Sequence, residues 1–136
     1  MAVQTVFSGA LGAGFAAGTP FFLYQDNTYV VLDFEAVVTV AASIEWFLEF
    51  TSGNPNDVGA EWYQETAQED AGGGVVGMPK VLRTLQANGG GTLAAGTHRV
   101  STQFVRKHLY ARIQVRQSAG TVTDLTVLNV FGGPTS

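Results

Sequence analysis

Hydrophobic and polar residues alternate along three stretches of the chain. Every even position from 30 to 40 is apolar, whereas the odd positions between them include Asp33 and Glu35. The same alternation returns in 44–50 and again in 109–116. Because successive side chains of a β-strand point to opposite faces, each stretch predicts a strand with one buried and one exposed face.

Further strands are expected between segments rich in turn-forming residues. These segments are 52–57, 71–74, 88–91 and 118–120. The strands expected between and after them are 61–68, 75–86, 92–105 and 121–131. The stretch 61–68 also fits a short helix, with Trp62 and Thr66 on one face, and the pattern leaves this choice open.

Together these stretches give about seven or eight strands and no long amphipathic helix. The predicted fold class is therefore all-β, an antiparallel jelly-roll or Greek-key sandwich with an extended N-terminal arm. No internal repeat or linker divides the chain. We accordingly expect one sandwich domain over 21–136, preceded by the arm over 1–20.

The first 25 residues carry no charged side chain. Such a run resembles a signal peptide or a membrane span, but it has no positively charged start, and glycines and Pro20 interrupt it. We therefore expect no membrane partner, and we expect the small residues to let the arm lie across a neighbouring molecule. The side chains predicted to contact that neighbour are Val3, Phe7, Leu11 and Phe15.

The charged residues are divided unevenly along the chain. Residues 1–79 hold ten of the 11 acidic residues and no lysine or arginine, and 80–136 hold all seven basic residues. Opposite charges attract, so the halves should form either cross-strand ion pairs within a domain or complementary faces between copies. In the second case Arg106, Lys107 and Arg112 would meet an acidic partner surface. The net charge of −4 argues against nucleic acid as a partner.

The sequence offers little catalytic chemistry. Cysteine is absent, which excludes disulfides, thiolate metal sites and cysteine nucleophiles. Asp33 and Glu35 would stand about 6.6 Å apart on a strand, within the roughly 5–9.5 Å that separates glycosidase carboxylates. Two solvated charges on an outer face are the better explanation of this pair. Glu65, Glu69 and Asp70 could hold a hard cation, although their spacing fits no loop motif. No catalytic residue, cofactor or metal site is therefore expected.

Two neighbouring aromatic residues give the clearest binding signal. Trp62 and Tyr63 follow the turn-rich segment 52–57 and lie beside acidic residues. Adjacent residues of a strand cannot both point into one core, so at least one of the two rings should be exposed. Exposed aromatic rings next to polar groups suit sugar stacking or protein contacts, which makes Trp62 and Tyr63 candidate sugar contacts. Trp46, by contrast, shares the parity of the predicted core.

The second half of the chain resembles small virion proteins of tailed bacteriophages. The rhythm aromatic-x-Arg-x-x-Val, formed by Tyr110, Arg112 and Val115, is followed by Gly120-Thr121 and a threonine-rich final strand. This succession of strand and turn residues is similar to that of phage decoration and fibre-associated β-sandwiches. The stretches that carry the resemblance are 81–85, 93–100, 104–115 and 120–127, within 75–131. It is a pattern of strands and turns, and no functional residue transfers with it.

The resemblance implies a non-enzymatic structural protein of the virion. The expected role is a capsid decoration, or cement, protein on the capsid surface, which stabilises the head by binding the major capsid protein lattice. The expected partners are the major capsid protein and further copies of this chain, in a homo-oligomer for which a trimer is one option. The alternative is a tail- or fibre-associated module that binds a carbohydrate or receptor.

Overall fold

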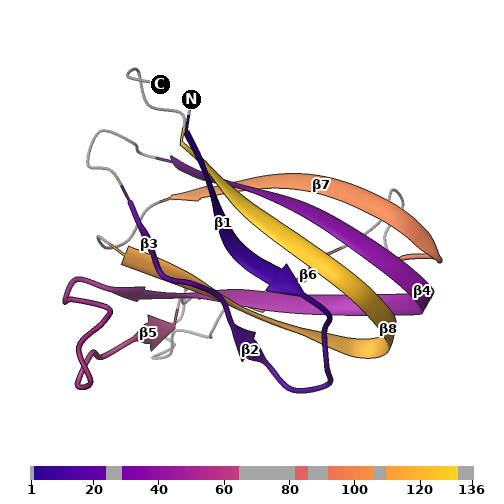
Figure 1. Cartoon of the computed structure of the whole chain (residues 1–136), viewed down its shortest axis with the longest axis horizontal. Coiled ribbons are helices and arrows are strands. Elements are labelled where there is room, and N and C mark those ends of the chain that lie inside the picture. Colours follow the sequence, from indigo (N-terminus) through magenta and orange to yellow (C-terminus); the bar gives the residue numbers. More distant parts are fainter. Residues whose placement is uncertain (1, 24–28, 65–81, 86–91, 106–109, 132–136) are drawn as a thin grey trace, which may run out of the picture.

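The computed structural model describes residues 2–23, 29–64, 82–85, 92–105 and 110–131 of the 136-residue chain (Figure 1). These residues form eight strands in one antiparallel sheet and no helix, which confirms the all-β expectation. The strands are β1 (Ala2–Gly9), β2 (Ala16–Ala17), β3 (Phe21–Phe22), β4 (Tyr29–Thr51), β5 (Tyr63–Gln64), β6 (Arg83–Leu85), β7 (Gly96–Val105) and β8 (Tyr110–Phe131). Of the stretch 61–68 the structure describes 61–64, and there Tyr63 and Gln64 form a short strand, whereas 61 and 62 belong to neither a strand nor a helix.

Two unusually long strands organise the sheet. β4 has 23 residues and β8 has 22, and the two pair with each other along nearly their whole length. Strands of globular proteins usually have about 5–6 residues, so each of these serves as two strands joined end to end. The register between them shifts repeatedly between Val37 and Ile44. Such bulges bend a strand and increase its twist, and both strands turn back at this point (Figure 1).

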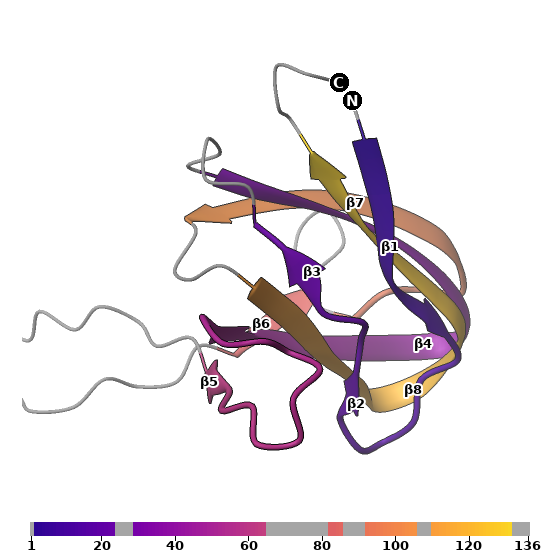
Figure 2. The same ribbon diagram turned by 60° about the vertical axis from the view of Figure 1, so that its left-hand side comes forward.

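Because both long strands bend, the sheet folds over into two layers that face each other (Figure 2). In the first layer the order is β1, the second half of β8, the first half of β4, and β7. In the second layer β2 and β3 lie beside the first half of β8, followed by the second half of β4 and then β5 and β6. The rings of Phe34 and Trp46, from the two halves of β4, lie 5.0 Å apart between the layers.

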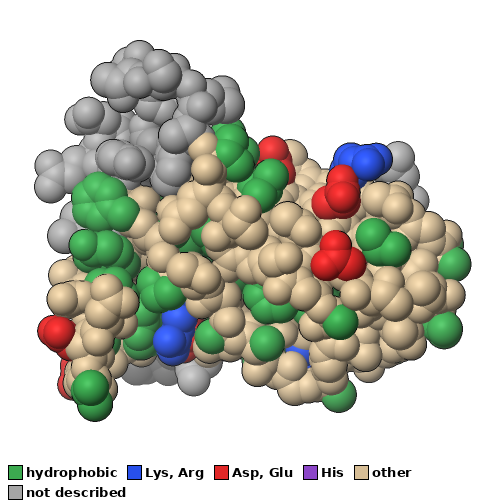
Figure 3. Space-filling model, in the orientation of Figure 1, with side chains coloured by type: hydrophobic (Ala, Val, Ile, Leu, Met, Phe, Trp, Pro, Cys, Tyr) green, Lys and Arg blue, Asp and Glu red, His purple; other side chains and the backbone are tan. Residues whose placement is uncertain are grey.

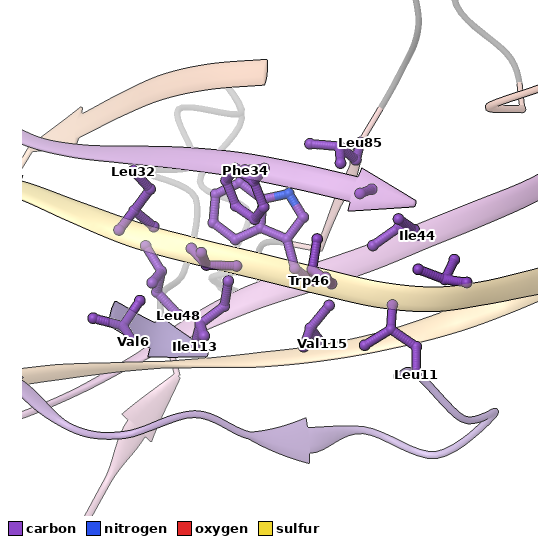
Figure 4. Packing of buried hydrophobic residues seen from close by; sticks show 14 of the residues in the cluster. Val6, Leu11, Leu32, Phe34, Ile44, Trp46, Leu48, Leu85, Ile113 and Val115 are labelled. Carbon is purple, nitrogen blue, oxygen red and sulfur yellow. The ribbon is translucent and has the colours of Figure 1, made fainter. Parts of the chain in front are cut away.

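The core fills the space between the layers, as the alternation predicts (Figure 4). Even-numbered residues of β4 on both sides of the bend are buried, and Trp46 is among them, as expected. β8 contributes alternate residues such as Ile113 and Val115. Val40 is the exception, since it is 58% exposed although its even number predicts burial. It sits among the register shifts, where the alternation of faces is interrupted.

The N-terminal segment lies differently from the extended arm predicted over 1–20. β1 runs antiparallel to the end of β8, from Ala2 opposite Phe131 to Gly9 opposite Leu125. β2 and β3 then pair with the start of β8. Within one copy the segment therefore forms an edge of both layers, and it contributes Val6 to the core. We call residues 2–22, which contain β1, β2 and β3, the N-terminal edge.

Gly18 allows this close packing between β2 and β3. Its amide donates a hydrogen bond of 2.8 Å to the carbonyl of Ile113, and the amide of Thr19 donates one of the same length to Val6. A Cβ atom at Gly18 would overlap the carbonyl oxygen of Val6 and come within 2.9 Å of Ile113. A residue without a side chain is thus required where the segment crosses between β1 and β8.

Candidate functional site

Acidic and basic side chains on the outer faces of the sheet pair across neighbouring strands. Glu35 of β4 accepts a hydrogen bond of 2.8 Å from Arg99 of β7. In the second layer Glu45 pairs with Arg116 at 2.6 Å, and Glu49 pairs with Arg112 of β8. The partners stand directly opposite each other in the strand register. Acidic and basic groups are accordingly mixed on the visible face (Figure 3). The sequence left open either cross-strand ion pairs within a domain or complementary faces between copies, and the described pairs are cross-strand.

Asp33 and Glu35, the candidate carboxylate pair, lie on the outer face of the first layer. They line a shallow groove of about 480 Å³ together with Arg99, Ser101 and Leu128. The Ser101 hydroxyl donates a hydrogen bond of 2.5 Å to Asp33, and Arg99 holds Glu35. Each carboxylate is thus engaged by the residue opposite it on β7. Both carboxylates are therefore held in cross-strand contacts on the outer face.

Arg112, predicted to meet a partner surface, is bound within its own chain. Its guanidinium lies 4.2 Å from the ring centroid of Trp62 and donates a hydrogen bond of 2.7 Å to Glu49. Gln114 donates a second hydrogen bond, of 2.8 Å, to the same oxygen of Glu49. Cation–π contact and charge-assisted hydrogen bonding act together here, and they hold the loop that carries Trp62 against the second layer. The Arg112 side chain is only 26% exposed.

A second arginine forms a similar cluster at the other side of the same face. Arg116 lies 4.5 Å from the ring centroid of Phe15 and pairs with Glu45. Phe15 also makes an edge-to-face contact with Phe47, at 4.9 Å between centroids. The outer face of the second layer is therefore flanked by two segments, around Phe15 and Trp62, and an arginine of β8 contacts each of them.

The loop between β4 and β5 forms a concave surface, and the hollow that it borders has a volume of about 770 Å³. The chain makes two successive turns there, since the Asp57 amide bonds to the carbonyl of Asn54, and Ala60 bonds to that of Asp57. Tyr63, at the end of the loop, is 57% exposed, and its hydroxyl donates a hydrogen bond of 2.9 Å to Glu61. That hydrogen bond, and the negative charge of Glu61, raise the pKa of the Tyr63 phenol above its ordinary value.

Trp62 and Tyr63 thus differ in their availability as sugar contacts. Trp62 is half-buried, and Arg112 covers its ring. Tyr63 remains substantially exposed beside the concave surface. Strand parity predicted that one of the two rings would be exposed, but the arginine that covers Trp62 lies 50 positions further along the chain and no local spacing reveals it.

The predicted partner contacts of the N-terminal segment have different exposures. Val3 is 55% exposed and Phe15 38% exposed, whereas Phe7 is half-buried. Leu11 is only 8% exposed, because it packs into the core of its own chain, so it cannot contact a partner in this conformation. Phe22, at the end of the segment expected to contact a neighbour, is 36% exposed and contacts Tyr110 edge to face. Arg106, Lys107 and the acidic group Glu65, Glu69 and Asp70 lie outside the described residues.

Among the described residues no helix is long and apolar enough to cross a bilayer. Within the same residues no three histidine, aspartate or glutamate side chains gather where they could hold a metal ion.

No protein-family model matches the chain, and no curated protein or solved structure matches it either. The similarity to phage virion proteins therefore stays a prediction from the sequence.

Proposed function

We propose that the chain is a structural protein of a bacteriophage virion, and more specifically a capsid decoration protein that binds as a homo-oligomer over the major capsid protein lattice. Three features support this proposal: the winding of the sheet, the absence of charge from the N-terminal edge, and the apolar side chains exposed along that edge. The last of these carries the proposal.

The order of the strands supports a jelly-roll sandwich. When β4 and β8 are each divided at the bend, and β2 with β3 and β5 with β6 are each counted as one, the strands of the described residues form eight segments. The first segment pairs with the last, the second with the seventh, the third with the sixth, and the fourth with the fifth. This is the winding of a long antiparallel ribbon rolled into two layers. Jelly rolls are common in viral capsid proteins and in lectins, although a fold alone does not decide a function.

The N-terminal edge has the character of a contact surface. It carries no charged side chain, and it exposes Val3, Phe15 and Phe22 along the borders of both layers. Figure 3 views the molecule from this side and shows hydrophobic side chains between the polar ones. Apolar residues at the border of a β-protein favour association, because an uncharged edge lacks the charges that usually keep edge strands apart. Many such contacts, repeated by the symmetry of a capsid, would add up through effective concentration.

Co-sedimentation with capsids tests the proposal. Purified full-length chain would be mixed with capsids of the encoding virus that lack it, and the bound fraction would be measured after centrifugation. We expect saturable binding that weakens at least about ten-fold in the double variant Val3→Ser/Phe22→Ser, because central apolar contacts dominate most interfaces. Val58→Ser is the matched control, since Val58 is a fully exposed apolar residue in the loop between β4 and β5.

Two results would overturn the proposal. One is a wild-type chain that does not bind capsids at any concentration. The other is electron microscopy of complete virions in which antibody against the chain labels tails rather than heads, which would favour the tail- or fibre-associated module. Circular dichroism of the variants distinguishes a lost contact from a lost fold.

A further inference from the structure

A second surface, independent of the N-terminal edge, has the features of a ligand site. It is the concave surface formed by the loop between β4 and β5, of about 770 Å³. Its lining includes Asn54, Asp57, Glu61 and Tyr63. β5 borders the second layer at the side opposite to β2 and β3, so the N-terminal edge and this surface can be occupied and tested separately.

Contacts at both ends of the loop hold it in shape. The Gly53 amide donates to the Thr51 hydroxyl at 3.2 Å, and the turns at Asp57 and Ala60 follow. At the far end Trp62 is stacked beneath Arg112. A surface that is already ordered loses little conformational freedom when a ligand binds, so weak polar contacts can contribute to affinity.

Tyr63 provides an oriented aromatic platform at this surface. More than half of the side chain is exposed, and the hydrogen bond from its hydroxyl to Glu61 restricts the ring. An aromatic ring of this kind presents an apolar face and a polar end to the same ligand. The C–H face of a pyranose ring is the complementary surface, because it is apolar on one side and bears hydroxyl groups around its rim.

The lining also indicates which sugars would bind. It contains the carboxylates of Asp57 and Glu61 and no lysine or arginine among the described lining residues. Carboxylates accept hydrogen bonds from sugar hydroxyls but repel sialic acid and phosphorylated sugars. We propose that this surface binds an uncharged pyranose unit of a glycan, with Tyr63 stacked on the ring and with Glu61 and Asp57 accepting from its hydroxyls. This would make the chain a glycan-binding protein whether or not it also decorates a capsid.

The test uses the full-length chain and two sets of glycans, one neutral and one carrying sialic acid or phosphate. Binding would first be surveyed on an array and then measured in solution by saturation-transfer NMR with the best neutral glycan. We expect neutral glycans to bind, Tyr63→Ala to weaken binding at least about ten-fold, and Tyr63→Phe to keep most of it, because the stacking ring remains. Glu61→Gln should weaken binding by a smaller factor.

Phe22→Ala is the matched control, since it removes an exposed aromatic ring from the other border of the same layer. It should leave glycan binding unchanged while it weakens capsid binding. Tyr63→Ala should weaken glycan binding and leave capsid binding unchanged. The glycan proposal is overturned if no neutral glycan binds at millimolar concentration, if charged glycans bind better than neutral ones, or if Tyr63→Ala binds as well as the wild type.

Discussion

At the scale of single residues, the bend in the sheet depends on Gly120. This residue has a φ of +75°, a backbone conformation that side chains other than glycine rarely adopt. A Cβ atom there would also overlap the carbonyl oxygen of Ala41 on the neighbouring strand. β8 therefore passes beside β4 at the bend only because position 120 has no side chain.

Gly120→Ala should consequently destabilise the protein by about 1–3 kcal/mol, since strained backbone and steric overlap act together. Gly12→Ala is the comparison, because nothing lies within 4 Å of a Cβ atom at that glycine and its φ is not in the left-handed region. Its effect should stay within about 0.5 kcal/mol. Urea denaturation of both variants measures the difference, and equal losses would contradict this account of the bend.

At the scale of strands, the outward ion pairs differ in how much they contribute. Glu35 and Arg99 are 47% and 74% exposed, so water and salt screen their attraction. Glu49 is only 17% exposed and accepts hydrogen bonds from both Arg112 and Gln114. Removing its charge leaves Arg112 partly buried without its carboxylate, which is more costly than losing an exposed pair.

We expect Glu49→Gln to lower the free energy of unfolding by about 1–2 kcal/mol, and Glu35→Gln to change it by less than about 0.5 kcal/mol. Chemical denaturation at low and high salt separates the two, because only the exposed pair should lose its small contribution when salt is added. Tryptophan fluorescence gives a second readout, since Glu49→Gln should loosen the stack between Arg112 and Trp62 and change the emission of that ring, whereas Trp46 stays buried in the core. Similar small effects for both variants would show that the cluster does not hold the loop.

The sequence predicts strands where the pattern is local. Alternation in β4 and β8 identified the inward positions, such as Phe34 and Ile113, because strand parity needs only neighbouring residues. It did not identify the pairing of β1 with the end of β8, because partners such as Phe7 and Val127 lie near opposite ends of the sequence and no local pattern links them. The covering of Trp62 by Arg112 is long-range in the same way, so only the three-dimensional arrangement shows that Tyr63 is the better sugar platform.

At the scale of the whole molecule, the N-terminal segment forms the border of both layers by pairing with the two ends of β8. β1 borders the first layer through its pairing with the end of β8, and β2 and β3 border the second layer at the start of β8. The N-terminal segment therefore has two roles under the proposed function, because it stabilises its own chain and offers apolar side chains to a neighbour. A deletion cannot separate these roles, whereas substitutions of Val3 and Phe22 can.

Deletion of residues 1–20 should accordingly destabilise the rest of the chain, whereas deletion of an independent arm would leave the rest intact. It removes the buried side chains of Val6 and Leu11, each worth about 1.5–3 kcal/mol, together with the hydrogen bonds that cover one edge of β8. A domain usually has only about 5–15 kcal/mol of stability, so the truncated chain should melt at a much lower temperature or aggregate through the exposed edge. Circular dichroism and size-exclusion chromatography measure both effects, with Val3→Ser/Phe22→Ser as the variant that should keep the fold. A truncated chain that remains monomeric and melts at the wild-type temperature would instead support the separate arm that the sequence suggested, and β1 would then be dispensable to the sheet.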